Sequence, residues 1–122
     1  MDIQPQAPAI LLIEKDEITL EIYQRELCKS FKVFAFTDLN SAFEALASHD
    51  IRAIIIEPEI SSGQGWERIN SIDVVFPNRP IPVIVCSTRD SSIVNSEKNI
   101  TLYLTKPVLP KTLRERILGV LG

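Results

Sequence analysis

The stretch Ala53-Ile54-Ile55-Ile56-Glu57 decides the fold that this sequence predicts. Four consecutive apolar residues, without a polar residue at every second position, are typical of a strand covered on both faces. Such strands occur in parallel sheets with helices on each side. Glu57 follows the apolar run directly, so the strand delivers a carboxylate to the edge of the sheet. The same five residues therefore predict both a fold class and the position of a polar site.

Apolar runs and helix-like segments alternate along the rest of the chain. We expect strands at residues 9–14, 31–36, 53–57, 82–87 and 102–105, and helices at 17–29, 39–48, 66–75 and from 110 onward. Right-handed crossovers between five such strands give an α/β fold with a doubly wound, five-stranded parallel sheet. The last crossover contains residues 91–98, which are mostly poor helix formers, so we expect a shortened or irregular fourth helix there.

Periodicity within these segments predicts which side chains are buried. In the first helix we place four residues on one buried face: Ile18, Ile22, Tyr23 and Leu27. The helix at 66–75 carries Trp66, Ile69 and Ile72 at spacings of three, and the last helix has a buried stripe of Leu113, Ile117 and Leu121. Residues 58–65 are rich in serine and glycine, so we expect a loop there.

Length and composition predict one domain, residues 9–122, after a short flexible segment, residues 1–8. A net charge of −3 argues against a nucleic-acid-binding face, which would need a basic patch. No apolar run approaches the ~18 residues that span a bilayer, and the N-terminus lacks the features of a signal peptide. We therefore expect a cytoplasmic protein without membrane contact. Cys28 and Cys86 have no metal-ligand spacing, and we expect both to be buried free thiols.

Polar side chains follow several of the predicted strands. Glu14-Lys15-Asp16 follows the first strand, Glu57 the third, Ser87 and Thr88 the fourth, and Lys106-Pro107 the fifth. The carboxyl ends of parallel strands meet at one edge of the sheet, where doubly wound proteins have their working sites. We therefore expect five of these residues to converge on one pocket: Glu14, Lys15, Glu57, Ser87 and Lys106.

This arrangement resembles the response-regulator receiver domains of two-component signalling, over about residues 9–121. The resemblance also includes Gly65, eight residues after Glu57, and Tyr103, at the position of the family's switch aromatic residue. It implies a flavodoxin-like (βα)5 fold, a bound magnesium ion and phosphotransfer from a histidine kinase. In this family an aspartate that accepts phosphate occupies the position of Glu57.

The departures from the family fall on the residues that carry out its chemistry. Lys15 stands where receivers place a second metal-binding carboxylate, and an ammonium beside magnesium is repelled by roughly several kcal/mol. We therefore hypothesise that Lys15 replaces the metal, since the charges of Glu14 and Glu57 would then balance those of Lys15 and Lys106. Asp16 is expected to start the first helix instead of binding metal.

The resemblance and its departures together predict a degenerate receiver, or pseudo-receiver. We expect no enzymatic activity and no cofactor, and we expect Glu57 to accept hydrogen bonds from Ser87 and Lys106. The output would be binding to a signalling protein, either a histidine kinase or an output protein, with a homodimer as a further possibility. The expected surface consists of the last strand and the last helix, with four candidate residues: Tyr103, Lys111, Arg114 and Arg116.

Three interpretations of Glu57 stay open at the level of sequence. It is a relict of a lost phosphorylation site, or it holds a fixed conformation that mimics the phosphorylated state, or it accepts phosphate itself. The last interpretation would use magnesium, held by Glu14 with Asp16 as a substitute ligand. A flavodoxin-like cofactor binder is disfavoured, because Glu14-Lys15-Asp16-Glu17 is acidic, lacks glycine and would repel a phosphate group.

Overall fold

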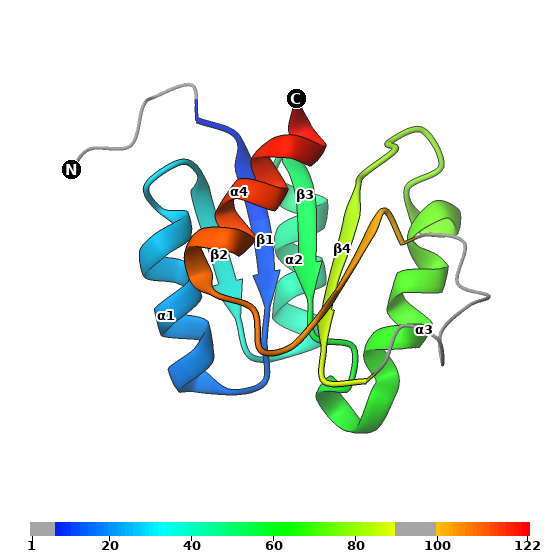
Figure 1. Cartoon of the computed structure of the whole chain (residues 1–122). Coiled ribbons are helices and arrows are strands. Elements are labelled where there is room, and N and C mark those ends of the chain that lie inside the picture. Colours follow the sequence, from blue (N-terminus) through cyan, green and yellow to red (C-terminus); the bar gives the residue numbers. More distant parts are fainter. Residues whose placement is uncertain (1–6, 90–99) are drawn as a thin grey trace.

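The computed structural model describes residues 7–89 and 100–122, and these form an α/β domain around one parallel sheet (Figure 1). The strands are β1 (Ala9–Ile13), β2 (Lys32–Phe36), β3 (Ile51–Ile56), β4 (Val83–Ser87) and β5 (Leu102–Thr105). The helices are α1 (Glu17–Leu27), α2 (Leu39–Ser48), α3 (Ile60–Val75) and α4 (Pro110–Leu121). The strand order β2-β1-β3-β4-β5 is the flavodoxin-like order, which confirms the predicted doubly wound sheet.

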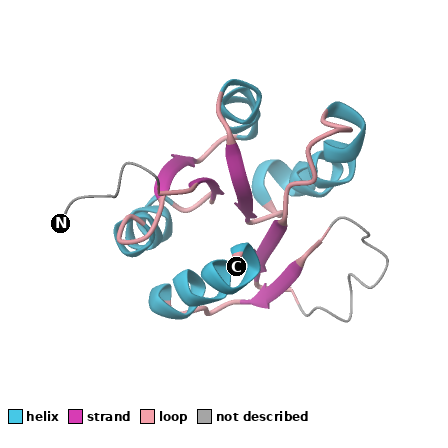
Figure 2. Cartoon of the chain, turned by 90° about the horizontal axis from the view of Figure 1, so that it is seen from above, coloured by secondary structure: helices cyan, strands magenta, loops and turns pink. Residues whose placement is uncertain are grey.

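Two layers of apolar side chains cover the sheet, one on each face. Helices lie on both sides of the strands (Figure 2). Alternate residues of β3 illustrate this division: Ile54 and Ile56 pack with α2 and α3, whereas Ala53 and Ile55 pack with α1 and α4. The continuous apolar runs arise because both faces of each central strand are buried.

Helix α1 begins where the sequence predicts, but its buried face is different. The Asp16 carboxylate accepts a hydrogen bond from the Thr19 backbone N–H at 2.9 Å and so caps the helix. Tyr23 and Leu27 are buried as expected, whereas Ile18 and Ile22 are 71% and 48% exposed. The prediction for these two isoleucines is wrong because, at 100° per residue, they lie roughly opposite Leu27 on the helix.

Helix α3 begins earlier than predicted, since residues 60–65 are helical and not part of a loop. Ile60 is buried in the core, so its packing outweighs the poor helix propensity of the serines and glycines that follow. Gly65 allows this close packing, because a Cβ atom there would lie 2.7 Å from the Pro58 carbonyl oxygen. The helix therefore starts directly beside the end of β3.

Helix α4 is held against α1 by an ion pair. The Arg114 Nε atom lies 2.8 Å from Glu26 Oε2, and Arg114 also donates a hydrogen bond to Ser30 Oγ. Leu113 and Ile117 are buried as predicted, and Leu121 is partly buried against the same layer.

The structure tests some of the predictions about segments and thiols and leaves others untested. The segment 91–98, predicted to hold the irregular fourth helix, lies outside the described residues, as do residues 1–6 of the N-terminal segment. None of the described helices is long and apolar enough to cross a membrane. Cys28 and Cys86 are both free, but only Cys86 is fully buried, and that burial raises its thiol pKa to about 12.

Candidate functional site

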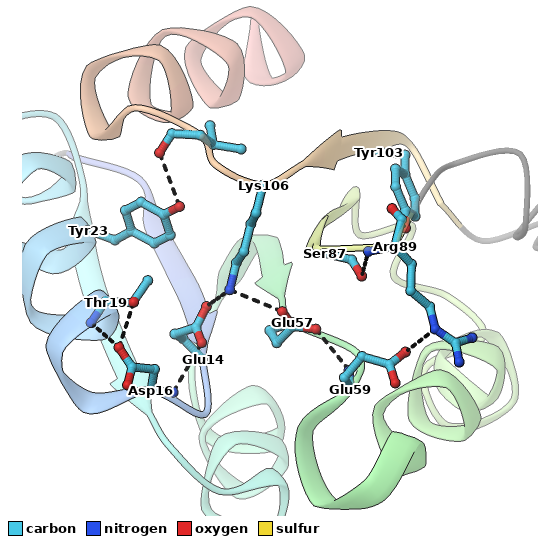
Figure 3. A network of polar contacts seen from close by, with 11 residues as sticks. Glu14, Asp16, Thr19, Tyr23, Glu57, Glu59, Ser87, Arg89, Tyr103 and Lys106 are labelled. Carbon is cyan, nitrogen blue, oxygen red and sulfur yellow. Dashed lines mark hydrogen bonds and ion pairs between the residues drawn. The ribbon is translucent and has the colours of Figure 1, made fainter.

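The ends of three strands bring two carboxylates and one ammonium together (Figure 3). The Lys106 Nζ atom lies 2.6 Å from Glu14 Oε1 and 3.0 Å from Glu57 Oε1. The Glu14 and Glu57 side chains are only 3% and 2% exposed, and that of Lys106 is 15% exposed. The predicted convergence of these three residues is therefore confirmed, as a buried charge cluster with Lys106 between the two acids.

The remaining carboxylate oxygens of this cluster are also hydrogen-bonded. Glu14 Oε2 accepts a hydrogen bond from the Asp16 backbone N–H at 3.1 Å. Glu57 Oε2 accepts one from the Glu59 backbone N–H at 3.0 Å. Each of the four carboxylate oxygens thus has a donor within the protein, which is what burial of ionised carboxylates requires.

Opposing effects act on the Lys106 ammonium. Burial alone would lower its pKa, because desolvation disfavours the charged form. The hydrogen bonds and negative charges of Glu14 and Glu57 outweigh burial, so the pKa of Lys106 is raised above its ordinary value of 10.5. Lys106 therefore keeps its positive charge at neutral pH.

Lys15 does not have the role predicted from the sequence. Its side chain is exposed and makes no ion pair with any residue that the structure describes. Successive side chains of an extended chain point in opposite directions, so the inward orientation of Glu14 directs Lys15 outward. The hypothesis that Lys15 replaces the metal is wrong, and Lys106 alone bridges the two acids. The cluster consequently carries a charge of −1, not the neutral sum predicted from the sequence.

Asp16 starts helix α1, as predicted, and its carboxylate is used for that purpose. One oxygen, Oδ2, accepts hydrogen bonds from the backbone N–H and the hydroxyl of Thr19, at 2.9 and 2.6 Å. These bonds lower the pKa of the Asp16 carboxyl. Asp16 contributes a backbone N–H to the buried cluster, while its carboxylate faces the helix.

Ser87 and Thr88 lie beside the cluster without joining it. Ser87 is fully buried, but its Oγ accepts the backbone N–H of Arg89 at 3.1 Å, and the predicted hydrogen bond to Glu57 is not formed. Strand β4 places this hydroxyl toward its own following loop. Thr88 is exposed and lines a hollow of about 360 Å³ next to Lys106.

Tyr103 lies partly buried on β5, and its hydroxyl donates to the Arg89 carbonyl oxygen at 2.7 Å. Its ring packs against the apolar layer of α2 and α3. The Tyr103 hydroxyl thus contacts the loop that follows β4 and not the charge cluster itself (Figure 3).

Sequence reasoning missed three residues around the cluster. Glu59 and Arg89 form an ion pair, with Arg89 Nε 3.4 Å from Glu59 Oε2, across the ends of β3 and β4 (Figure 3). Tyr23 donates its hydroxyl to the Val108 carbonyl oxygen at 3.2 Å, and burial raises its pKa. The sequence does contain a signal for the Glu59–Arg89 pair, because an acidic and a basic residue follow two strands that are neighbours in the sheet.

The side chains, as they lie, do not fit the magnesium ion that the resemblance implies. Magnesium requires a near-octahedral shell of oxygen ligands. The four oxygens of Glu14 and Glu57 already accept hydrogen bonds, and Lys106 occupies the position between them. The Asp16 carboxylate, the substitute ligand, is bound to Thr19.

Comparison with known proteins identifies the fold. No protein-family model matches the chain, and no curated protein matches it. Many solved structures do match. The chemotaxis response regulator CheY4 of Vibrio cholerae superimposes with a TM-score of 0.84 at 18% identity, covering 94% of this chain and 99% of the other. A CheY-like receiver domain protein from Methanospirillum hungatei JF-1 gives 0.83 at 18% identity, covering 95% and 94%.

A response regulator from Thermotoga maritima gives a TM-score of 0.78 at 24% identity, covering 94% of this chain and 98% of the other. All three similarities extend over nearly the whole chain. They show that the domain has the CheY-like receiver fold.

Proposed function

We propose that this domain is a phosphorylation-independent pseudo-receiver of two-component signalling, which acts by binding a signalling protein. The CheY-like fold supports the receiver part of this proposal. The observation that carries the pseudo-receiver part is the position of Lys106, whose ammonium pairs with both Glu14 and Glu57, at 2.6 and 3.0 Å.

The state of Glu57 argues against its use as a phosphate acceptor. Both of its oxygens are engaged, one by the Lys106 ammonium and one by the Glu59 N–H, and its side chain is almost inaccessible. A glutamate also extends one bond further than an aspartate, and in-line transfer loses about 100-fold in rate for an ångström of misplacement. Glu57 instead serves as a fixed negative charge that holds the ends of β3 and β5 together.

The surface proposed for partner binding is formed by β5 and α4. Tyr103 is partly exposed there, and Lys111 and Arg116 are exposed on α4. Arg114, the fourth candidate from the sequence, does not belong to this surface, because its guanidinium is turned toward Glu26 and Ser30 of the neighbouring helix. A partner that presents acidic groups around an aromatic contact would complement the remaining residues.

Incubation with acetyl phosphate and magnesium, followed by intact-protein mass spectrometry, tests the proposal. We expect no added phosphoryl group on the wild-type chain. A hydroxylamine-labile adduct on the wild type that is absent from Glu57→Gln would contradict the proposal and establish the alternative, a working phosphoacceptor. The double variant Glu57→Asp with Lys15→Asp has the family's residue types at both positions. It serves as the comparison, because it shows whether the fold can be phosphorylated when those residues are present.

A further inference from the structure

A continuous series of contacts leads from the buried cluster to the surface of β5. It begins at Glu57, whose Oε2 accepts the backbone N–H of Glu59 at 3.0 Å. The Glu59 carboxylate in turn pairs with Arg89 at 3.4 Å. These contacts join the end of β3 to the loop that follows β4, so Arg89 is tied to the position of Glu57 through one intervening residue (Figure 3).

Arg89 uses its backbone as well as its side chain. Its N–H donates to Ser87 Oγ at 3.1 Å, and its carbonyl oxygen accepts the Tyr103 hydroxyl at 2.7 Å. One residue therefore contacts three parts of the fold: the turn after β3, the end of β4 and the side chain of Tyr103 on β5. Lys106 also joins Glu57 to the end of β5, through its ammonium at 3.0 Å, but it makes no hydrogen bond with the Tyr103 side chain.

Ser87 lies at the end of β4, beside the cluster, but its side chain does not connect Glu57 with Tyr103. Its hydroxyl oxygen is occupied by the Arg89 N–H and makes no hydrogen bond with Glu57. The contacts that lead from Glu57 to the Tyr103 hydroxyl run through Glu59 and Arg89. We propose that Arg89 is the positioning residue that couples the buried Glu57 carboxylate to the Tyr103 side chain at the binding surface. This inference rests on the proposed function, in which Tyr103 belongs to the surface that meets a partner.

The strength of this coupling depends on how firmly the Glu59 carboxylate is held. The Arg89 and Glu59 side chains are 52% and 26% exposed, and an ion pair of this exposure is weak alone. The Trp66 indole N–H, however, donates to the same oxygen, Glu59 Oε2, at 2.9 Å. Because helix α3 supplies this second donor, Arg89 meets a carboxylate whose position is already fixed.

The test compares the effect of Glu57→Gln on Tyr103 in two backgrounds, with NMR signals of the Tyr103 ring as the readout. In the wild-type background we expect Glu57→Gln to shift these signals, because the charge that orients the series of contacts is lost. In an Arg89→Ala background we expect the same substitution to shift them several-fold less. Arg25→Ala is the control, because Arg25 forms an exposed ion pair with Glu21 at 3.3 Å within helix α1 and takes no part in the contacts between Glu57 and Tyr103.

An undiminished shift in the Arg89→Ala background would overturn the inference, and so would the absence of any shift in the wild-type background. If Arg89→Ala does not fold, Arg89→Gln removes the charge while keeping most of the side-chain volume, and the same two outcomes apply. Failure of the coupling is distinguishable from failure of the proposed function. A phosphoryl adduct in the mass measurement would overturn the latter and leave the NMR comparison unchanged.

Discussion

Lys106 is the residue on which the arrangement of the site depends. It is the shared counterion of two carboxylates that are almost completely buried. An isolated buried charge is strongly unfavourable, so removal of one partner from such a cluster costs more than the interaction itself contributes. This asymmetry permits a sharp comparison between the two lysines that the sequence places near the site.

Lys106→Met should lower the free energy of unfolding by roughly 3 kcal/mol, the low end for a broken buried pair, because Glu14 and Glu57 would face each other without a counterion. Lys15→Met is the matched control and should change stability by less than about 0.5 kcal/mol, as is usual for an exposed residue. Urea denaturation at neutral pH measures both. Equal losses of stability in the two variants would show that Lys15 is also a counterion of Glu14 and Glu57.

At this scale the sequence predicts which residues gather, but not how their side chains pair. Glu14, Glu57 and Lys106 were found because each follows an apolar strand, and the edge of a parallel sheet collects such residues. Lys15 was misassigned because charges were added without regard to side-chain direction. The alternation of an extended chain turns Lys15 away whenever Glu14 points inward. Pairing also depends on rotamers, which residue order does not specify.

Among the elements, α3 depends on one close contact at its start. Gly65→Ala should destabilise the domain by about 1–3 kcal/mol, because the new methyl group would lie 2.7 Å from the Pro58 carbonyl oxygen and force the helix away. Gly119→Ala in α4 meets open space and should instead stabilise the protein by about 0.5–1 kcal/mol.

Thermal or urea unfolding of the two glycine variants, followed by circular dichroism, measures this difference. The same sign of change at both positions would contradict the close approach of α3 to the end of β3.

Helix α1 provides a pH-dependent prediction through its cap. Asp16→Ala should destabilise the domain at neutral pH, whereas Asp16→Asn, which keeps an acceptor for the Thr19 N–H, should cost less. The folded-state pKa of Asp16 is lowered, so its contribution is present above the ordinary value of 3.8 and is lost as the pH falls below it. Urea unfolding of wild type and Asp16→Ala should therefore converge in acid. A difference that stays constant across this range would exclude the cap as its source.

The existence and order of the elements were predictable, whereas some boundaries and faces were not. Long apolar runs identify strands such as β3 and β4 without ambiguity, because both faces of the sheet must be covered. The start of α3 was missed because serine and glycine suggest a loop, and only tertiary burial of Ile60 reveals a helix. Ile18 is exposed because it lies opposite Leu27 on helix α1, and only the packing of α1 in the fold shows which of the two faces is buried.

In the molecule as a whole, the charge cluster joins strands that are far apart in sequence. Because the folded-state pKa of Lys106 is raised, the stability it contributes is fully present below the ordinary value of 10.5 and is lost as the pH rises through the raised pKa. We therefore expect the free energy of unfolding to fall in alkali above that value. Lys15→Met should show the same fall, measured by urea unfolding across this range. If the Lys15→Met variant did not show this fall in alkali, the assignment of the fall to Lys106 would be contradicted.

The connection from Glu57 through Glu59 and Arg89 to Tyr103 is a property of the whole fold, and this explains why the sequence did not reveal it. Arg89 and Tyr103 are brought together by the pairing of β4 with β5. Glu59 reaches Arg89 because β3 and β4 are neighbours in the sheet. Such contacts require the register of three strands, which apolar patterning alone does not provide.

The most direct test is to follow the Lys106 side-chain ammonium by NMR while magnesium is added at neutral pH. If Lys106 replaces the metal as the counterion of Glu14 and Glu57, its signals will stay unchanged at millimolar magnesium, and its pKa in a metal-free titration will lie above 10.5. A saturable shift of the Lys106 signals on addition of magnesium would show that a metal enters between the two carboxylates, and would contradict the account.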